Sequence, residues 1–424
     1  MSTTPTPDPS LRFRPLRPAV AGDAPGSLDL LVSVVPPPAP AAGSTRPPLN
    51  LALVIDRSGS MDGPPLSQAR KAARFLAREL TPADRLAIVV FDHEAELLVP
   101  SMAVNDPELF VSAINTIRAR GMTDLQQGWR TGAMQVAEQL NPDALNRVLL
   151  LSDGHTNHGI MEAGEIGRQV RGLSQHGVST SAFGLGDGFD EDLMGAIASG
   201  GDGTLAFIDD PRQLPDLYAN ELSGLTNTAA QRISLGIRTR NGAELTDVLN
   251  DLPQTGSGNW QLPSLRFGRE LHVAVRIELP AWTANADIAS LRLAWERPGD
   301  SQRHSRVELL SLPVMPAAEL AGMAVDSLVA EQFALLQANR DRQHAIDALD
   351  AGDLQAADQH LMAIDDCLSV VPGSAAVNAE RDSIRQRRAM LHKDRNRSRK
   401  NLRREAMRSS VNVWERNSDS GPRS

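Results

Sequence analysis

The sequence predicts an α/β fold in which a doubly wound, mostly parallel sheet is inserted into an antiparallel β-sandwich and followed by an α-helical C-terminal region. Between residues 48 and 219, apolar runs of strand length alternate with amphipathic helical segments, which is typical of a parallel sheet covered by helices on both faces. Between residues 225 and 316, strand-length runs are separated by turn signals and show no helical periodicity. After Pro316 the pattern becomes helical again.

The N-terminal part of the chain is expected to contribute strands to the β-sandwich. Residues 1–10 are polar and proline-rich and are expected to form a flexible tail, whereas residues 11–46 are assigned to the sandwich. Within them, residues 27–35 form a strand-like apolar run that ends at the prolines of residues 36–40. Because a single strand is not stable alone, the later strand-rich region is its expected partner.

Residues 48–219 are expected to form the α/β domain. Its strand-type runs are residues 51–56, 86–91, 148–152, 178–185 and 204–208. Its amphipathic helical segments are residues 66–80, 107–119, 125–139 and 162–176. The first helical segment places three alanines and two leucines on one face at helical spacing, so this face is expected to pack on the sheet.

The second half of the chain is divided between strands and helices. Residues 225–316 are assigned to the rest of the sandwich, with strands expected at residues 233–239, 271–279, 288–295 and 305–310. Residues 317–392 are expected to be helical, in segments 317–339, 342–351 and 354–367. The pair on either side of Gly352-Asp353 resembles one helical hairpin of the tetratricopeptide type. Residues 393–424 are expected to be a basic, flexible tail.

The composition excludes several classes of protein. The 424 residues carry a net charge of −9, include one cysteine and are only 4% aromatic. A single cysteine excludes an intramolecular disulfide framework and a cysteine-rich zinc site, and we expect Cys367 to be a small buried apolar residue. The scarcity of aromatic residues argues against nucleic-acid binding on stacking platforms.

No segment of the sequence predicts export or membrane insertion. The N-terminus has no basic-then-apolar signal pattern, and no apolar run reaches the roughly 18 residues that a membrane helix needs. We therefore expect a cytoplasmic protein without a membrane span.

The most specific pattern is an oxygen-rich loop that follows a predicted buried strand. In Asp56-Arg57-Ser58-Gly59-Ser60, three oxygen side chains occupy alternate positions at the strand end. Ligands collect at the carboxyl ends of strands in an open parallel sheet, where such side chains can converge on one small cation. Thr123 and Asp153 lie at equivalent edges, and Asp153 directly follows the strand 148–152. An all-oxygen set selects hard ions, Mg²⁺ first, with Mn²⁺ and Ca²⁺ also possible.

The charge of this set indicates a docking site. Only Asp56 and Asp153 are carboxylates, so a divalent ion bound mainly by hydroxyl groups and water stays electrophilic and keeps an open coordination position. A carboxylate from another molecule is the best group to fill that position.

These residues resemble a von Willebrand factor A domain with a complete metal-ion-dependent adhesion site, and the resemblance covers residues 49 to about 219. Asp56, Ser58 and Ser60 match the Asp-x-Ser-x-Ser motif, Thr123 matches the later loop threonine, and Asp153 matches the later loop aspartate. The resemblance implies direct coordination by the two serines and the threonine, with both aspartates often acting through water. It also implies a doubly wound, Rossmann-like fold whose last helix, near residues 211–222, can shift when ligand binds.

The wider arrangement is similar to bacterial stand-alone proteins of this superfamily, and the β domain is similar to the one beside such modules in inter-alpha-trypsin inhibitor heavy chains. Intracellular relatives serve ATPase-chaperone pairs or phosphosignalling operons. The resemblance therefore suggests an ATPase chaperone or a phosphosignalling protein as the unidentified partner that supplies an Asp or Glu ligand.

Several neighbours of the motif are assigned more ordinary roles. His155 and His158, in the loop after Asp153, and Asp187, in a glycine-rich loop, are the candidate partner-binding residues near the metal face. Solvated loop histidines are the favoured interpretation of the first two. Asp62 is expected to be a loop or helix N-terminal residue rather than a ligand, and Asp124 is expected to cap the helical segment after it.

Enzymatic activity is not expected, because the chain lacks a nucleophile elbow, a P-loop, a His-Glu-x-x-His zinc motif and a dinucleotide fingerprint. In addition, Asp56-Arg57-Ser58 lacks the second aspartate of the phosphatase Asp-x-Asp pattern. The alternative to a protein-binding module is a nucleic-acid-associated protein that acts through a basic C-terminal arm. Residues 381–408 contain 12 basic and 3 acidic residues, whereas the rest of the chain carries a net charge of −18. We favour a solvated helix extension that neutralises the acidic body, so nucleic-acid binding is not the expected function.

Overall fold

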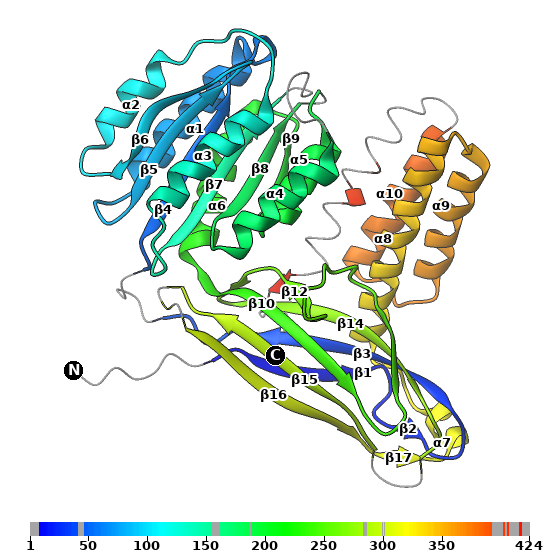
Figure 1. The fold of residues 1–424 in the computed structure, drawn as a ribbon. Helices are drawn as coiled ribbons and strands as arrows, with labels where there is room; N and C mark the ends of the chain where they lie inside the picture. The colour runs from blue at the N-terminus through cyan, green and yellow to red at the C-terminus, as the bar shows by residue number, and fades with distance from the viewer. Residues whose placement is uncertain are drawn as a thin grey trace, which may run out of the picture. The chain divides into compact units, whose positions relative to one another are not determined.

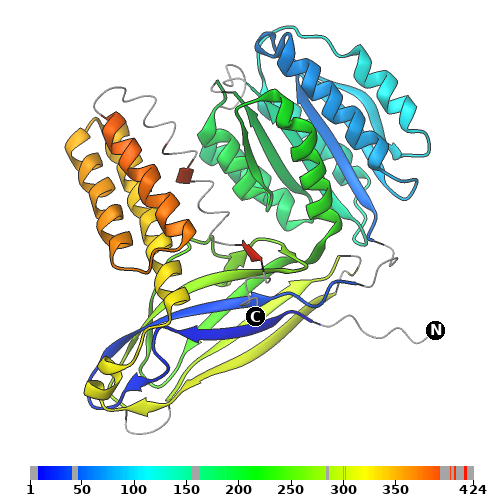
Figure 2. The ribbon, with the colours of Figure 1, turned by 180° about the vertical axis from the view of Figure 1, so that it is seen from behind.

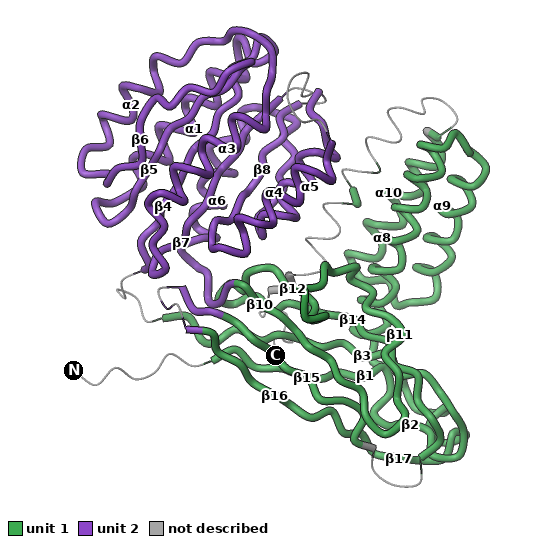
Figure 3. Tube along the Cα trace, in the orientation of Figure 1, with its two compact units in different colours: residues 1–40, 232–295, 303–424 green, residues 41–231, 296–302 purple. Residues whose placement is uncertain are grey.

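The chain forms two compact units, which Figure 3 shows in different colours. Residues 1–40, 232–295 and 303–424 make up the first, which we call the β–helical unit, and residues 41–231 and 296–302 make up the second, the α/β unit. The computed structural model describes residues 8–40, 46–153, 162–186, 188–282, 286–298, 300, 302–391, 402, 405, 406 and 415–417.

The α/β unit is built on a six-stranded sheet in the order β6-β5-β4-β7-β8-β9. Its strands are β4 (Leu49–Asp56), β5 (Arg85–Phe91), β6 (Ala95–Ala103), β7 (Leu145–Ser152), β8 (Ser179–Leu185) and β9 (Leu205–Ile208). All neighbouring strands are parallel except β5 and β6. This mostly parallel sheet is the predicted α/β fold class.

Helices cover both faces of the sheet (Figure 1). They are α1 (Pro64–Glu79), α2 (Pro107–Thr116), α3 (Leu125–Glu138), α4 (Ala163–Gln175), α5 (Glu191–Gly200) and α6 (Leu214–Thr226). Side chains alternate between the two faces of a strand. Accordingly, Leu51 and Leu53 of β4 lie in one core with α1, α2 and α6, whereas Val54 lies against Gly132 of α3. Burial on both faces explains why all eight residues of β4 are buried.

Strand β6 is absent from the predicted strands. It is the antiparallel edge strand of the sheet, it contains Pro100, and only Val99 among its nine residues is fully buried. Proline cannot donate a hydrogen bond to a neighbouring strand, so an edge is where it is tolerated. The half-exposed, proline-containing pattern therefore differs from the continuous apolar runs that predicted the other strands.

Aspartate side chains begin several of the helices. Asp124 accepts a hydrogen bond from the Gln127 N–H at 3.0 Å, which confirms it as the cap of α3. The helix predicted near residues 211–222 begins as a 3₁₀ turn, η2 (Pro211–Gln213), whose cap is Asp210, and it continues as α6. Each cap satisfies a backbone N–H at a helix start that has no partner within the helix.

The strands of the β–helical unit form two sheets, in the orders β1-β3-β14-β11 and β12-β10-β15-β16, with β18 paired to β14 and β13 paired to β10. The pairings of the first sheet are antiparallel, as is that of β10 with β12. The strands are β1 (Ser10–Pro15), β3 (Gly26–Val35), β10 (Thr228–Thr239), β11 (Glu244–Val248), β12 (Trp260–Leu262), β13 (Leu265–Arg266), β14 (Arg269–Leu279), β15 (Ala286–Glu296), β16 (Arg303–Leu312) and β18 (Glu415–Asn417). Two short strands, β2 (Val20–Ala21) and β17 (Val314–Met315), pair in parallel.

The N-terminal strand finds its partner among the later strands. β3 lies between β1 and β14, and Leu30 is opposite Val275 in the register with β14. Within the segment expected to be a flexible tail, Glu415–Asn417 forms β18 at the start of β14. The face-to-face packing of the two sheets as a sandwich stays a prediction.

The helices that follow are α7 (Ala317–Gly322), α8 (Ser327–Ala351), α9 (Leu354–Ser369) and α10 (Ala375–Leu391). The break predicted near residues 340–341 was wrong: it lies at residues 323–326, because Asp326 caps α8 by accepting hydrogen bonds from two backbone N–H groups. Gly352, with a φ of 87°, ends α8, and Asp353 caps α9. The helical hairpin around Gly352-Asp353 is therefore confirmed, and α8, α9 and α10 lie side by side in both ribbon views (Figures 1 and 2).

The single cysteine lies in this helical region. Cys367 of α9 is half-buried and packs against the apolar core of the hairpin. Burial raises the pKa of its thiol, and the Asp341 carboxylate raises it further. The thiol is therefore protonated at neutral pH and behaves as an apolar group. Among the described helices, none is both long enough and apolar enough to cross a membrane.

One buried carboxylate holds the start of the central strand. Asp84 is fully buried and accepts hydrogen bonds from the Arg46 guanidinium at 2.7 and 2.5 Å and from the Leu49 N–H at 2.9 Å. The N–H and hydroxyl of Thr81 donate to the same carboxylate. Burial alone would raise the pKa of Asp84, but these hydrogen-bond donors lower it below its usual value. The carboxylate therefore ties the start of β4 to the loop before β5.

We expect Asp84→Asn to lower the free energy of unfolding by about 3 kcal/mol, because the substitution leaves Arg46 without its partner in a buried site. Urea unfolding followed by circular dichroism measures the change. Glu108→Gln is the matched control, since it breaks an exposed arginine–carboxylate pair with Arg78 at 2.9 Å and should leave the midpoint unchanged. Equal midpoints for both variants would contradict the role assigned to Asp84.

Candidate metal centre

The loop after β4 is organised by the carboxylate of Asp56. Asp56 is fully buried at the end of the strand. Its Oδ1 accepts a hydrogen bond from the Ser58 N–H at 2.7 Å, and its Oδ2 accepts one from the Ser152 hydroxyl at 2.6 Å. Because Ser152 is the last residue of β7, this carboxylate fixes the ends of two neighbouring parallel strands against each other.

The hydroxyls of the motif continue this chain of oxygen atoms. The Oγ atoms of Ser58 and Ser60 lie 3.1 Å apart, and the Ser60 hydroxyl donates to Asp153 Oδ1 at 2.7 Å. A short 3₁₀ turn, η1 (Gly59–Met61), places Ser60 at the surface while Met61 is buried beneath it. The structure therefore brings Asp56, Ser58, Ser60 and Asp153 together in one hydrogen-bonded set.

Thr123 belongs to a second loop that is held against the first. The Gly59 N–H donates to the Gly121 carbonyl at 3.1 Å, and the Arg120 N–H donates to the Arg57 carbonyl at 2.7 Å. Gly121 has a φ of 74°, and a Cβ there would lie 2.6 Å from Nδ1 of His93. Only glycine fits this position, which sets the path of the chain into Thr123, a buried residue.

An ion-pair network around the buried Asp92, which the sequence did not predict, ties these loops together. Asp92, directly after β5, accepts hydrogen bonds from Arg57 Nε at 2.7 Å and Arg120 Nε at 2.9 Å. The Asp92 carbonyl accepts from the Asp124 N–H at 2.7 Å, and Arg57 also pairs with Glu96 at 2.8 Å. The position of Asp92 in the sequence could have identified it, because it directly follows a parallel strand and lies at the same edge of the sheet as Asp56.

The network also directs positive charge away from the oxygen set. Arg57 lies between Asp56 and Ser58 in the sequence, yet its guanidinium is engaged by Asp92 and Glu96. Burial alone would raise the pKa of Asp92, but the guanidinium groups of Arg120 and Arg57 hold it below its usual range. Asp92 is thus ionised, and together with Glu96 it balances the charges of Arg57 and Arg120.

Asp56 and Asp153 have the opposite electrostatic character. Burial raises the pKa of Asp56 to about 6, against the lowering effect of hydrogen bonds from Ser152 and Ser58, and the nearby Asp153 raises it further. Burial also raises the pKa of Asp153. Negative charge at this set of oxygens is therefore costly, and a bound cation would stabilise it.

The structure does not describe every predicted site residue. His155, His158 and Asp187, expected to bind a partner, lie outside the described residues. Asp62 ends η1 and is exposed, as expected of a loop residue.

Comparison with known proteins agrees with the fold and with the position of the motif. Residues 50–220 match the family model of the von Willebrand factor type A domain. The chain contains a von Willebrand factor A (VWA) domain. Domains of this family typically mediate protein–protein interaction and generally bind a divalent metal at the site of this motif.

Similarity extends beyond the VWA domain. The chain is 28% identical over 332 residues to the uncharacterized protein sll0103 of Synechocystis sp., which covers 74% of this chain and 76% of that protein. It is 32% identical over 158 residues to human inter-alpha-trypsin inhibitor heavy chain H4, covering 35% of this chain but only 17% of that protein. A solved von Willebrand factor type A protein from Catenulispora acidiphila has the same fold, with a TM-score of 0.71, 16% identity and coverage of 96% and 98% of the two chains.

The raised pKa of Asp56 predicts how stability depends on pH when metal is chelated. The native state holds a proton up to about pH 6, whereas the unfolded state releases it near pH 4, so stability falls as the pH rises between these values. Over this window wild type should lose about 2 kcal/mol more than Asp56→Asn, which carries no charge. Urea unfolding in EDTA at several pH values measures the difference, and parallel stability curves for the two proteins would contradict it.

Proposed function

We propose that the VWA domain is a divalent-metal-dependent protein-interaction module or assembly scaffold. The proposed ion is Mg²⁺, with Mn²⁺ or Ca²⁺ as alternatives, and Ser58, Ser60 and Thr123 are the proposed direct ligands. Asp56 and Asp153 supply the negative charge that holds the ion. The observation that carries the proposal is the hydrogen-bonded set of Asp56, Ser58, Ser60 and Asp153, in which the carboxylates accept from neutral groups, the Ser58 N–H and the hydroxyls of Ser152 and Ser60.

The chemistry of these residues supports docking rather than catalysis. Hydroxyl ligands are neutral, so the ion keeps most of its charge and attracts a further anionic oxygen. We propose that this oxygen comes from an Asp or Glu of a partner protein, and that the chain is not an enzyme. A cytoplasmic ATPase chaperone or phosphosignalling protein is the proposed class of partner.

The ion pairs of the basic C-terminal segment favour neutralisation of acidic side chains of the protein over a nucleic-acid interface. Arg381 pairs with Asp365 at 2.9 Å, and Arg388 pairs with Asp358 at 2.9 Å. Arg387 pairs with Glu405 at 2.7 Å. These guanidinium groups are thus engaged by carboxylates of the helical region itself, which leaves less positive charge for phosphate contacts.

Metal binding is tested first with Mg²⁺ alone. Ser60→Ala removes a proposed ligand at the surface, so we expect it to weaken Mg²⁺ binding at least about tenfold, because even indirect partners of a metal site are worth this much. Isothermal titration calorimetry measures the affinity. Ser67→Ala, at an exposed serine of α1, is the matched control and should bind as wild type does. Equal affinities for all three proteins would contradict the assigned ligand set.

Partner binding is tested by capture from native-cell lysate on the immobilised full chain. We expect a protein that is retained by wild type in Mg²⁺ and released in EDTA, and that Ser60→Ala does not retain. Replacing its surface Asp and Glu residues one at a time should identify one carboxylate whose loss abolishes retention. Retention that is equal in Mg²⁺ and EDTA would contradict a metal-bridged contact.

A further inference from the structure

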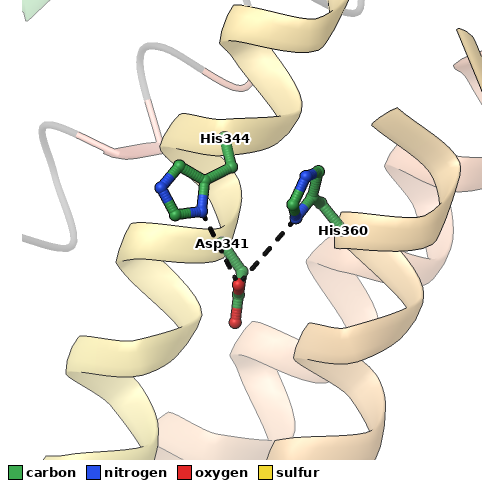
Figure 4. Close-up of side chains that lie close together, drawn as sticks. All are labelled: Asp341, His344 and His360. Atoms are coloured by element: carbon green, nitrogen blue, oxygen red, sulfur yellow. Dashed lines mark ion pairs between the residues drawn. The ribbon is translucent and has the colours of Figure 1, made fainter. Parts of the chain in front are cut away.

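A second group of metal-binding side chains lies in the β–helical unit, on the α8–α9 hairpin. Asp341 and His344 come from α8 and His360 comes from α9. One ligand atom from each residue lies within 4.8 Å of the corresponding atoms of the other two. Figure 4 shows both imidazole rings beside the Asp341 carboxylate. All three residues belong to the β–helical unit.

The helix geometry explains why these three residues meet. Asp341 and His344 are three residues apart, so they lie on the same face of α8. The tight turn at Gly352-Asp353 brings α9 back beside α8. Ala345 and Leu361, next in sequence to the two histidines, are buried in the hairpin core. The histidines therefore lie at the edge of the packed interface, on the side where both helices can contribute.

The distances are suited to ligands of a common ion rather than to direct hydrogen bonds. Asp341 Oδ1 lies 3.9 Å from Nδ1 of His344 and 4.0 Å from Nδ1 of His360. Both separations are too long for a hydrogen bond. Ligand atoms at about 2.0–2.1 Å from a tetrahedral Zn²⁺ ion lie roughly 3.3 Å apart. The two Asp341–histidine separations exceed this value by 0.6 and 0.7 Å, and all three ligand atoms lie within 4.8 Å of one another. A contraction of roughly 1 Å would therefore close the set around an ion.

The surroundings leave this group both oriented and accessible. Gln337, one turn before Asp341, donates its side-chain amide to Oδ2 at 3.3 Å, which leaves Oδ1 as the oxygen nearest the histidines. The Asp341 side chain is 15% exposed, whereas those of His344 and His360 are 58% and 38% exposed. An ion can thus reach the site from solvent and find one partly buried carboxylate already held in place.

We propose that Asp341, His344 and His360 bind a transition-metal ion of the Zn²⁺ class and thereby link α8 to α9. Two imidazole nitrogens with one carboxylate suit Zn²⁺, Co²⁺, Ni²⁺ or Cu²⁺ and disfavour Mg²⁺ and Ca²⁺, which prefer oxygen ligands. Three protein ligands leave the fourth position to water. The ligand chemistry thus differs from that of the all-oxygen set in the VWA domain, and the two proposals stand independently.

The test is a Co²⁺ titration of the full chain in excess Mg²⁺, followed by the visible absorption of the bound cobalt and by competition with Zn²⁺. Mg²⁺ keeps the oxygen ligands of the VWA domain from contributing. We expect His360→Ala and His344→Ala each to lower the affinity for Co²⁺ and Zn²⁺ at least about tenfold. His176→Ala, at an exposed histidine that ends α4, is the control and should bind as wild type does.

The outcomes separate clearly. Loss of binding in both hairpin variants, with unchanged circular dichroism and wild-type binding by His176→Ala, would establish the site. Because the His344 side chain is mostly exposed, its replacement should leave the fold intact even if His360→Ala disturbs the hairpin. Binding by His344→Ala at wild-type affinity, or an equal loss in His176→Ala, would overturn the proposal.

Discussion

A single desolvated carboxylate determines how the strand ends of the α/β unit are arranged. Asp56 ends a strand that is buried on both faces, where a negative charge is costly unless hydrogen bonds or a cation stabilise it. Its oxygens accept from the Ser58 N–H and the Ser152 hydroxyl, so the loop after β4 and the end of β7 are both set by this group. Ser58 then bonds to Ser60, and Ser60 bonds to Asp153, so the two carboxylates of the site are linked through the serine hydroxyls.

The arginine that the motif contains is kept from neutralising that charge. Asp92 and Glu96 hold the Arg57 guanidinium, and Asp92 also holds Arg120, which lies just before the loop of Thr123. The buried Asp92 carboxylate thereby positions the loop after β4 and the loop of Thr123. It also keeps the positive charge of the arginines apart from the negative charge of the oxygen set. The two carboxylates linked through serine hydroxyls, with pKa values raised by burial, form a site that a bound cation would stabilise.

Periodicity and order along the chain were enough to predict the parallel sheet and the oxygen set, because continuous apolar strands and a loop motif are local patterns. Strand β6 was missed because Pro100 and exposed residues give an edge strand no continuous apolar run. The start of α8 was misplaced because one cap, Asp326, outweighs the helical pattern on either side of it. The role of Asp92 and the closeness of Asp341 to His360 could not be predicted in this way. Both depend on which segments lie side by side in the fold, and a local sequence pattern does not contain that information.

The register of β3 also constrains the order in which the chain can fold during synthesis. β3 pairs along its length with β14, which is made more than two hundred residues later, whereas the strands of the α/β sheet pair only among themselves. At roughly 5–20 residues per second, β3 waits for on the order of ten seconds or more before its partner leaves the ribosome. Leu30, Leu31 and Val32, fully buried in the finished sheet, are without that partner in the meantime. The nascent chain therefore still exposes this apolar strand after its VWA domain is complete.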